Sequence, residues 1–135
     1  MFDKSHNLFA LIARVLMAAL FLPAGISKIA GFAGTVGYIG SVGLPMPELG
    51  AAIAVVVEVG GALALLLGFH TRWAALLMAL FTVVAGVFFH AFWNVAPEAM
   101  QMQQIMFMKN IAIAGGLLAL TAFGAGSISL DARKS

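Results

Sequence analysis

Three charged side chains, Arg14, Glu58 and Lys109, lie inside long apolar segments of this 135-residue chain. The chain is 63% hydrophobic and only 9% charged, so a charge in such a segment needs a physical reason. A charge at bilayer depth costs roughly 2.5–3.5 kcal/mol, and such groups usually face a bundle interior and pair with one another. The sequence therefore predicts an interior polar site suited to proton transfer or to binding an anionic or carbonyl-bearing ligand.

Helical spacing and depth predict which of these groups meet. Glu58 lies near the midplane of its segment, and Arg14 and Lys109 are each roughly one helical turn away in depth, on opposite sides. Glu58 is then the only acidic residue deep enough to neutralise either cation. We therefore predict a buried Arg14–Glu58–Lys109 network, with Asn110 as a hydrogen-bond partner.

Small and apolar residues share a helix face with two of these charges. Small neighbours let helices approach closely, so both faces are predicted to lie inside the bundle. The two predicted stripes are Arg14, Ala18, Phe21, Gly25 and Lys28, and Ala51, Ala54, Glu58, Gly61, Ala62 and Leu65.

Each candidate has a structural alternative. An Arg14–Glu58 pair can simply fix helix register, and Lys28 at a helix end can extend its ammonium group to the interface. One carboxylate cannot fully pair two cations, so Lys109 either is neutral or awaits a ligand. His90 is either a satisfied interfacial side chain or a group that exchanges protons with a ligand entering from the outer side.

The sequence argues against a metal centre. Four of the eight methionines lie in the segment 100–108, and thioethers suit Cu(I). No cysteine and no cluster of histidines accompanies them, so we interpret them as adaptable packing or as the lining of an apolar ligand site. The lack of cysteine also excludes a thiol–disulfide couple within the chain.

Four apolar stretches of about 20 residues can carry these groups across a membrane. We predict an all-α, integral-membrane four-helix bundle that forms a single domain over residues 1–135, with the first stretch retained rather than cleaved as a signal peptide. The predicted spans are about 8–29, 49–69, 73–93 and 103–123.

The distribution of Lys and Arg places both termini in the cytoplasm, with loops 30–48 and 94–102 outside. In the longer outer loop, Gly recurs every three residues from 31 to 43, which predicts a short interfacial helix or an ordered loop; a lid over a cavity is the alternative. The basic residues are scattered, so nucleic acid is not an expected partner.

Taken together, the ordered motifs resemble the DoxX family of small membrane proteins, in the branch found in the inner membrane of many proteobacteria. The motifs cover nearly the whole chain: Arg14, Leu20–Lys28, Gly31-Phe32, Tyr38, Gly43–Pro45, Glu58 with Gly60-Gly61, Leu65–Gly68, Thr71-Arg72, His90, Phe107–Ile111, Gly115–Leu117, Gly124 and Ser129–Asp131.

The resemblance implies a four-helix bundle and a link to thiosulfate:quinone oxidoreductase subunits or to membrane thiol and oxidative-stress systems. The leading hypothesis is therefore a quinone-associated inner-membrane subunit of an oxidoreductase or redox-stress system. In it, Lys109, Asn110 and His90 would donate hydrogen bonds and Glu58, held charged by Arg14, would carry protons.

Other functions stay open. The chain could be a non-catalytic membrane binding or assembly protein whose ion network is structural, or a small transporter. The expected partners are the lipid bilayer, a quinone or another small apolar ligand, an oxidoreductase subunit and a second copy of the chain.

Overall fold

The computed structural model describes residues 2–134, and all regular secondary structure among them is helical. Four helical segments are long and apolar enough to cross a membrane, as predicted. In chain order the elements are α1 (His6–Ala30), α2 (Phe32–Ser41), α3 (Pro47–Val55), the π-helical turn η1 (Val56–Gly60), α4 (Gly61–Leu67), α5 (Thr71–Phe89), the 3₁₀ turn η2 (Phe92–Asn94), α6 (Pro97–Phe123) and α7 (Leu130–Arg133).

The helix boundaries follow local chemistry. The second span, α3–η1–α4, begins at Pro47, and α6 begins at Pro97, because proline has a fixed φ suited to the first helical turn. As a result α6 starts six residues before the predicted position of 103. The Gly-rich segment after α1 forms the short helix α2, which is one of the two predicted outcomes.

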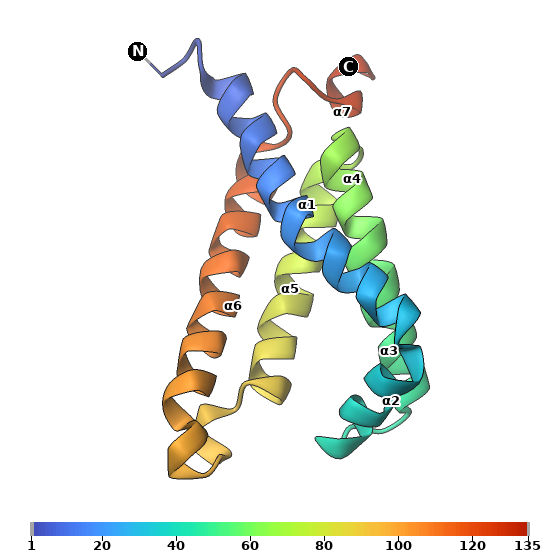
Figure 1. Ribbon diagram of the computed structural model, residues 1–135. Helices are drawn as coiled ribbons and strands as arrows, with labels where there is room; N and C mark the ends of the chain where they lie inside the picture. Colours follow the sequence, from blue (N-terminus) through green and yellow to red (C-terminus); the bar gives the residue numbers. More distant parts are fainter. Residues whose placement is uncertain (1, 135) are drawn as a thin grey trace.

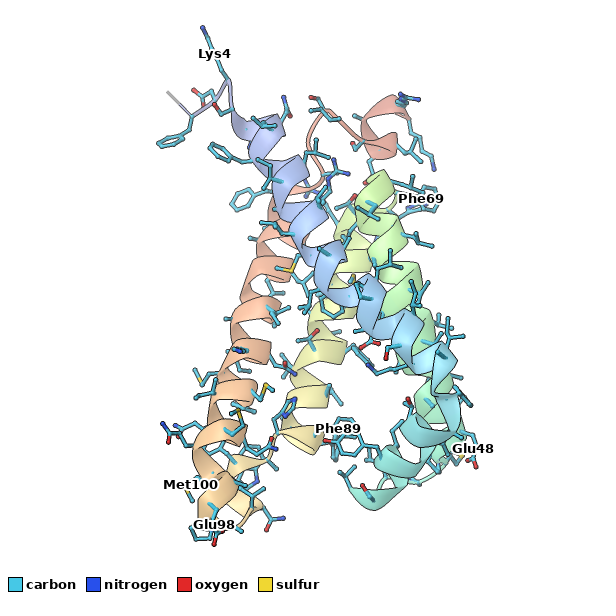
Figure 2. All side chains as sticks on the ribbon, viewed as in Figure 1. Lys4, Glu48, Phe69, Phe89, Glu98 and Met100 are labelled. Carbon is cyan, nitrogen blue, oxygen red and sulfur yellow. The ribbon has the colours of Figure 1, made fainter. Side chains whose placement is uncertain are left out.

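The chain termini lie at the same end of the molecule, while α2 and η2 lie at the other (Figure 1). Helices α5 and α6 run side by side, and α1 crosses the second span. At the end opposite the termini, the ring of Phe89 contacts that of Tyr38 from α2, with centroids 5.1 Å apart (Figure 2). This contact links α5 to the segment that follows α1.

The core is built where small side chains let the helices approach. Leu65, Met78 and Leu117 are fully buried there, surrounded by buried alanines from several helices. Most large apolar side chains are instead exposed on the outside of the bundle, as expected for a surface solvated by lipid. Packing by small residues takes the place of a large hydrophobic core.

Helix α1 and the second span approach closely at Gly25. A Cβ atom added there would lie 2.6 Å from Val59 Cγ2 and 3.1 Å from the Val59 backbone nitrogen. A backbone atom cannot yield as a flexible side chain can, so only glycine fits at this crossing. The crossing brings η1 directly against α1.

We therefore predict that Gly25→Ala lowers the free energy of unfolding by about 1–3 kcal/mol through overpacking. Gly60→Ala is the matched control, because an added Cβ at Gly60 meets nothing within 4 Å. Thermal unfolding of both variants in detergent micelles measures the difference. Equal stability of the two variants would show that the crossing is not tight.

Candidate functional site

The predicted ion network does not form. Glu58 is paired with Lys28 rather than with Arg14 or Lys109: Lys28 Nζ lies 3.1 Å from Glu58 Oε1 and 3.0 Å from Oε2. Side chains on a helix lean toward its N-terminus, so Lys28 near the end of α1 leans back toward the bilayer centre. The close crossing at Gly25, one turn away, brings Glu58 within its reach.

Glu58 occupies an unusual backbone setting. It lies in the π-helical turn η1, and such turns inside α-helices are often found at functional sites. The residue is only 7% exposed, and its Oε2 atom accepts no hydrogen bond among residues 2–134, although it lies close to the ammonium group. The Lys28 side chain is 31% exposed, so the pair is buried on the Glu58 side and reachable on the Lys28 side.

Arg14 is paired with backbone oxygens instead of a carboxylate, and its Nε atom has no hydrogen-bond acceptor among residues 2–134. Its guanidinium is fully buried and donates hydrogen bonds to the carbonyl oxygens of Leu65 (3.0 Å), Leu66 (3.4 Å) and Ile128. The last carbonyls of a helix have no intrahelical partners and carry partial negative charge, so the end of α4 suits a cation. The structure therefore gives Arg14 a structural position, away from Glu58.

The segment after α6 completes this end of the bundle. The backbone nitrogen of Ser127 donates to Asn7 Oδ1 (2.8 Å), and that of Asp131 donates to the Gly68 carbonyl (2.8 Å). The Asp131 carboxylate accepts hydrogen bonds from the backbone nitrogens of His70 (2.7 Å) and Thr71 (2.9 Å), and so caps α5.

Sequence reasoning missed the capping role of Asp131. The sequence carries only a weak signal for it. The N-cap residue of α5 is His70, which is not a usual capping residue, and its side chain makes no capping hydrogen bond. The free N–H groups of a helix start can be satisfied by water or by a distant side chain, and the sequence does not show that the tail, 60 residues later, folds back onto this turn.

The two remaining candidates, His90 and Asn110, make hydrogen-bond contacts between the α5 segment and α6. His90 Nδ1 lies 2.9 Å from Gln103 Oε1, and Asn110 Nδ2 donates to the Thr82 carbonyl at 3.1 Å. Asn110 is thus not a partner of a charged network. Both contacts fix the α5–α6 pair.

Lys109 lies on the exposed face of α6 and forms no ion pair within residues 2–134. It borders a shallow surface groove with Gln101, Gln104, Ile105, Met108 and Ala112. Over residues 2–134 there is no group of three or more His, Cys, Asp or Glu side chains placed to hold a metal ion.

The comparisons with known proteins agree with one another. Residues 9–91 match the family model described as DoxX. The chain is 42% identical to "Inner membrane protein YphA" of Escherichia coli over 98% of its own length and 94% of that protein. It is 41% identical to "Inner membrane protein YqjF" of the same organism, over 95% and 93% of the two chains.

A more distant relative is "Putative oxidoreductase CatD" of Bacillus subtilis, which is 32% identical over 58% of this chain and 57% of that protein. No solved structure matches.

We predict that Arg14→Met lowers the free energy of unfolding by at least about 2 kcal/mol, because a buried acceptor left without a donor costs about 1–3 kcal/mol. The exposed cation Lys4 provides a control, Lys4→Met, which should change stability little. Thermal unfolding in detergent measures both. If Arg14→Met is as stable as the control, Arg14 does not hold this end together.

The capping role of Asp131 predicts a pH dependence. Burial alone would raise the pKa of Asp131, but hydrogen bonds from Thr71 and His70 outweigh burial, so its pKa is lowered. The native state then holds fewer protons than the unfolded state as the carboxyl titrates, and stability rises with pH there. The stabilisation is complete above the unfolded pKa of about 3.9 and is lost as pH falls through the lower native value.

We therefore expect the wild type to be more stable than Asp131→Asn at pH 7, and the two melting temperatures to converge as pH falls below about 4. Asparagine keeps the size of the side chain and removes the titration. A constant difference between pH 7 and pH 3 would contradict the assignment.

Proposed function

The chain belongs to the DoxX family and is an integral inner-membrane protein, and from this premise we propose that it is the quinone-associated membrane subunit of an oxidoreductase or redox-stress system. The single observation that carries the proposal is the Lys28–Glu58 pair. Both groups are ionisable, and in this proposal they exchange protons inside an apolar bundle, where Lys28 is the partly accessible member.

The pair has the chemistry that a quinone head group requires. A quinone carbonyl accepts a hydrogen bond, and the Lys28 ammonium, partly exposed, has donors to offer it. Glu58 Oε2 has acceptor capacity left to take or return a proton. Ligand sites in proteins are mostly apolar with a few placed polar groups, and this pair amid apolar helices fits that pattern.

The electrons would come from a partner subunit. Reduction of a quinone to a quinol takes two electrons and two protons, and this chain has no cysteine to supply electrons from a dithiol. The name of the CatD relative, a putative oxidoreductase, supports a redox setting. In this proposal the chain binds the quinone and handles protons only.

A non-catalytic assembly role is the second candidate. It is favoured by the Arg14 contacts, all of which go to backbone carbonyls and have no evident chemical use. Under this hypothesis the Lys28–Glu58 pair fixes how α1 crosses the second span and binds no ligand. The two hypotheses differ in their predictions for quinone binding. Under the first, removing both charges of the pair weakens it; under the second, there is no quinone binding to weaken.

The test uses the full-length protein and a double variant, Lys28→Met with Glu58→Gln, which removes both charges together and leaves neither one unpaired. We expect the wild type to retain quinone after purification, as detected by organic extraction and chromatography, and to gain thermal stability when a short-chain ubiquinone is added. The double variant should fold and bind the added quinone at least tenfold more weakly.

Lys109→Met is the matched control, because Lys109 is a membrane-depth lysine on the outside of the bundle. We expect it to bind quinone like the wild type; weaker binding would restore Lys109 as a ligand residue. If the wild type carries no quinone and added quinone leaves its melting temperature unchanged, the proposed function is wrong and the assembly role is favoured.

A further inference from the structure

A pocket of about 420 Å³ lies at the end of the molecule that carries the termini, far along the chain from the Lys28–Glu58 pair. It is open to the surface and is bordered by the start of α5, the end of α6 and the α7 segment. It is lined by His70, Thr71, Arg72, Trp73, Phe123, Gly124, Ala125, Gly126, Asp131 and Ala132.

Arg72 is the cation that lines this pocket, and its exposed side chain lies close to the backbone of Gly124. A Cβ atom added to Gly124 would lie 3.0 Å from Arg72 Nε and 3.3 Å from Nη2, so the guanidinium lies directly against the glycine. Gly124 has φ +81°, a conformation that glycine adopts without strain. Within residues 2–134 the structure gives the Arg72 side chain no hydrogen bond or ion pair, so its five donors are available.

The backbone adds two further donors. The first N–H groups of a helix lack intrahelical acceptors; those of His70 and Thr71 donate to Asp131. The N–H groups of Arg72 and Trp73, in the same first turn of α5, have no assigned acceptor in the described chain. A helix N-terminus with free N–H groups favours an anion.

The carboxylate of Asp131 does not accept hydrogen bonds from the N–H groups of Arg72 and Trp73. Each of its oxygens already accepts a hydrogen bond, one from His70 and one from Thr71. Arg72 and Asp131 are the cation and the anion in the pocket lining, and the cations Arg133 and Lys134 follow Asp131 in the chain, with Lys134 Nζ 4.4 Å from the Phe69 ring centroid. Residues 69–73 and 130–134 together contain three cations and one carboxylate.

Two exposed aromatic rings place the pocket at the membrane surface. Trp73 is 75% exposed and Phe123 is 72% exposed, and they stand at the start of α5 and the end of α6, the ends of two membrane spans. Aromatic rings at span ends lie at the level of lipid head groups. A ligand held by Arg72 would therefore have its apolar part beside these rings.

We propose that this pocket binds the phosphate of an anionic phospholipid. The Arg72 guanidinium forms a two-pronged contact with the phosphodiester, the first-turn N–H groups of α5 add hydrogen bonds, and the acyl chains pack on Trp73 and Phe123. The site ties a lipid to the turn between α4 and α5 and to the tail that Arg14 and Asp131 hold in place.

The experiment measures lipid adducts on the full-length protein by native mass spectrometry, with phosphatidylglycerol, phosphatidylcholine or inorganic phosphate added separately. We expect the wild type to retain phosphatidylglycerol at least tenfold more tightly than Arg72→Gln does, with Arg72→Lys in between because lysine keeps the charge and loses the fork. Lys4→Gln is the control: it removes a cation at the same end of the molecule, on the other side from Phe69 (Figure 2), and should bind like the wild type.

Three results would overturn the proposal. Equal retention of phosphatidylglycerol by Arg72→Gln and Lys4→Gln would mean that Arg72 is not the anchor. Equal retention of phosphatidylcholine and phosphatidylglycerol by the wild type would mean that no anionic lipid is selected. This comparison uses the wild type alone, so it does not depend on whether the variants fold. Retention of inorganic phosphate by the wild type as tight as that of phosphatidylglycerol would assign the pocket to a free anion.

Discussion

The satisfaction of the buried Arg14 guanidinium is the constraint on which the rest of this end of the structure depends. A guanidinium cannot lose its charge, so once it is buried its donors need acceptors. The carbonyls of Leu65 and Leu66 at the end of α4 accept from Nη1, and that of Ile128 in the tail accepts from Nη2. The tail is therefore part of the folded bundle, and Asp131 can reach and cap α5 because Arg14 draws the chain back across this end.

The charges of the Lys28–Glu58 pair are compensated in a different way from the charge of Arg14. It uses two side chains rather than the backbone, one member is partly accessible, and its carboxylate lies in a π-helical turn. A pair of ionisable groups can exchange a proton with a ligand, while a guanidinium bound to carbonyls cannot. Rigid support at the termini and adjustable chemistry nearer the middle are thus separated along α1, which carries both Arg14 and Lys28.

The sequence predicts the spans and the inward faces well, because both depend on residue type and period alone. Arg14, Ala18, Phe21 and Gly25 are all buried on α1, and Ala51, Ala54, Glu58 and Ala62 are buried on the second span, as the two stripes predicted. The ion pairs could not be predicted by counting residues, because counting measures the depth of Cα atoms. A lysine ammonium lies several ångströms from its Cα, and the direction in which Lys28 leans decides which cation reaches Glu58.

The same geometry explains why Lys109 stays outside the network. It lies twelve residues into α6, roughly 18 Å from the end opposite the termini at 1.5 Å per residue, and its side chain leans toward that end. Gln104 and Gln101 lie on the same face in that direction. Its ammonium can thus extend along polar side chains toward the membrane surface, so it needs no carboxylate. Leaning toward the helix N-terminus carries Lys28 into the bundle and Lys109 out of the bilayer, because α1 and α6 cross the membrane in opposite directions.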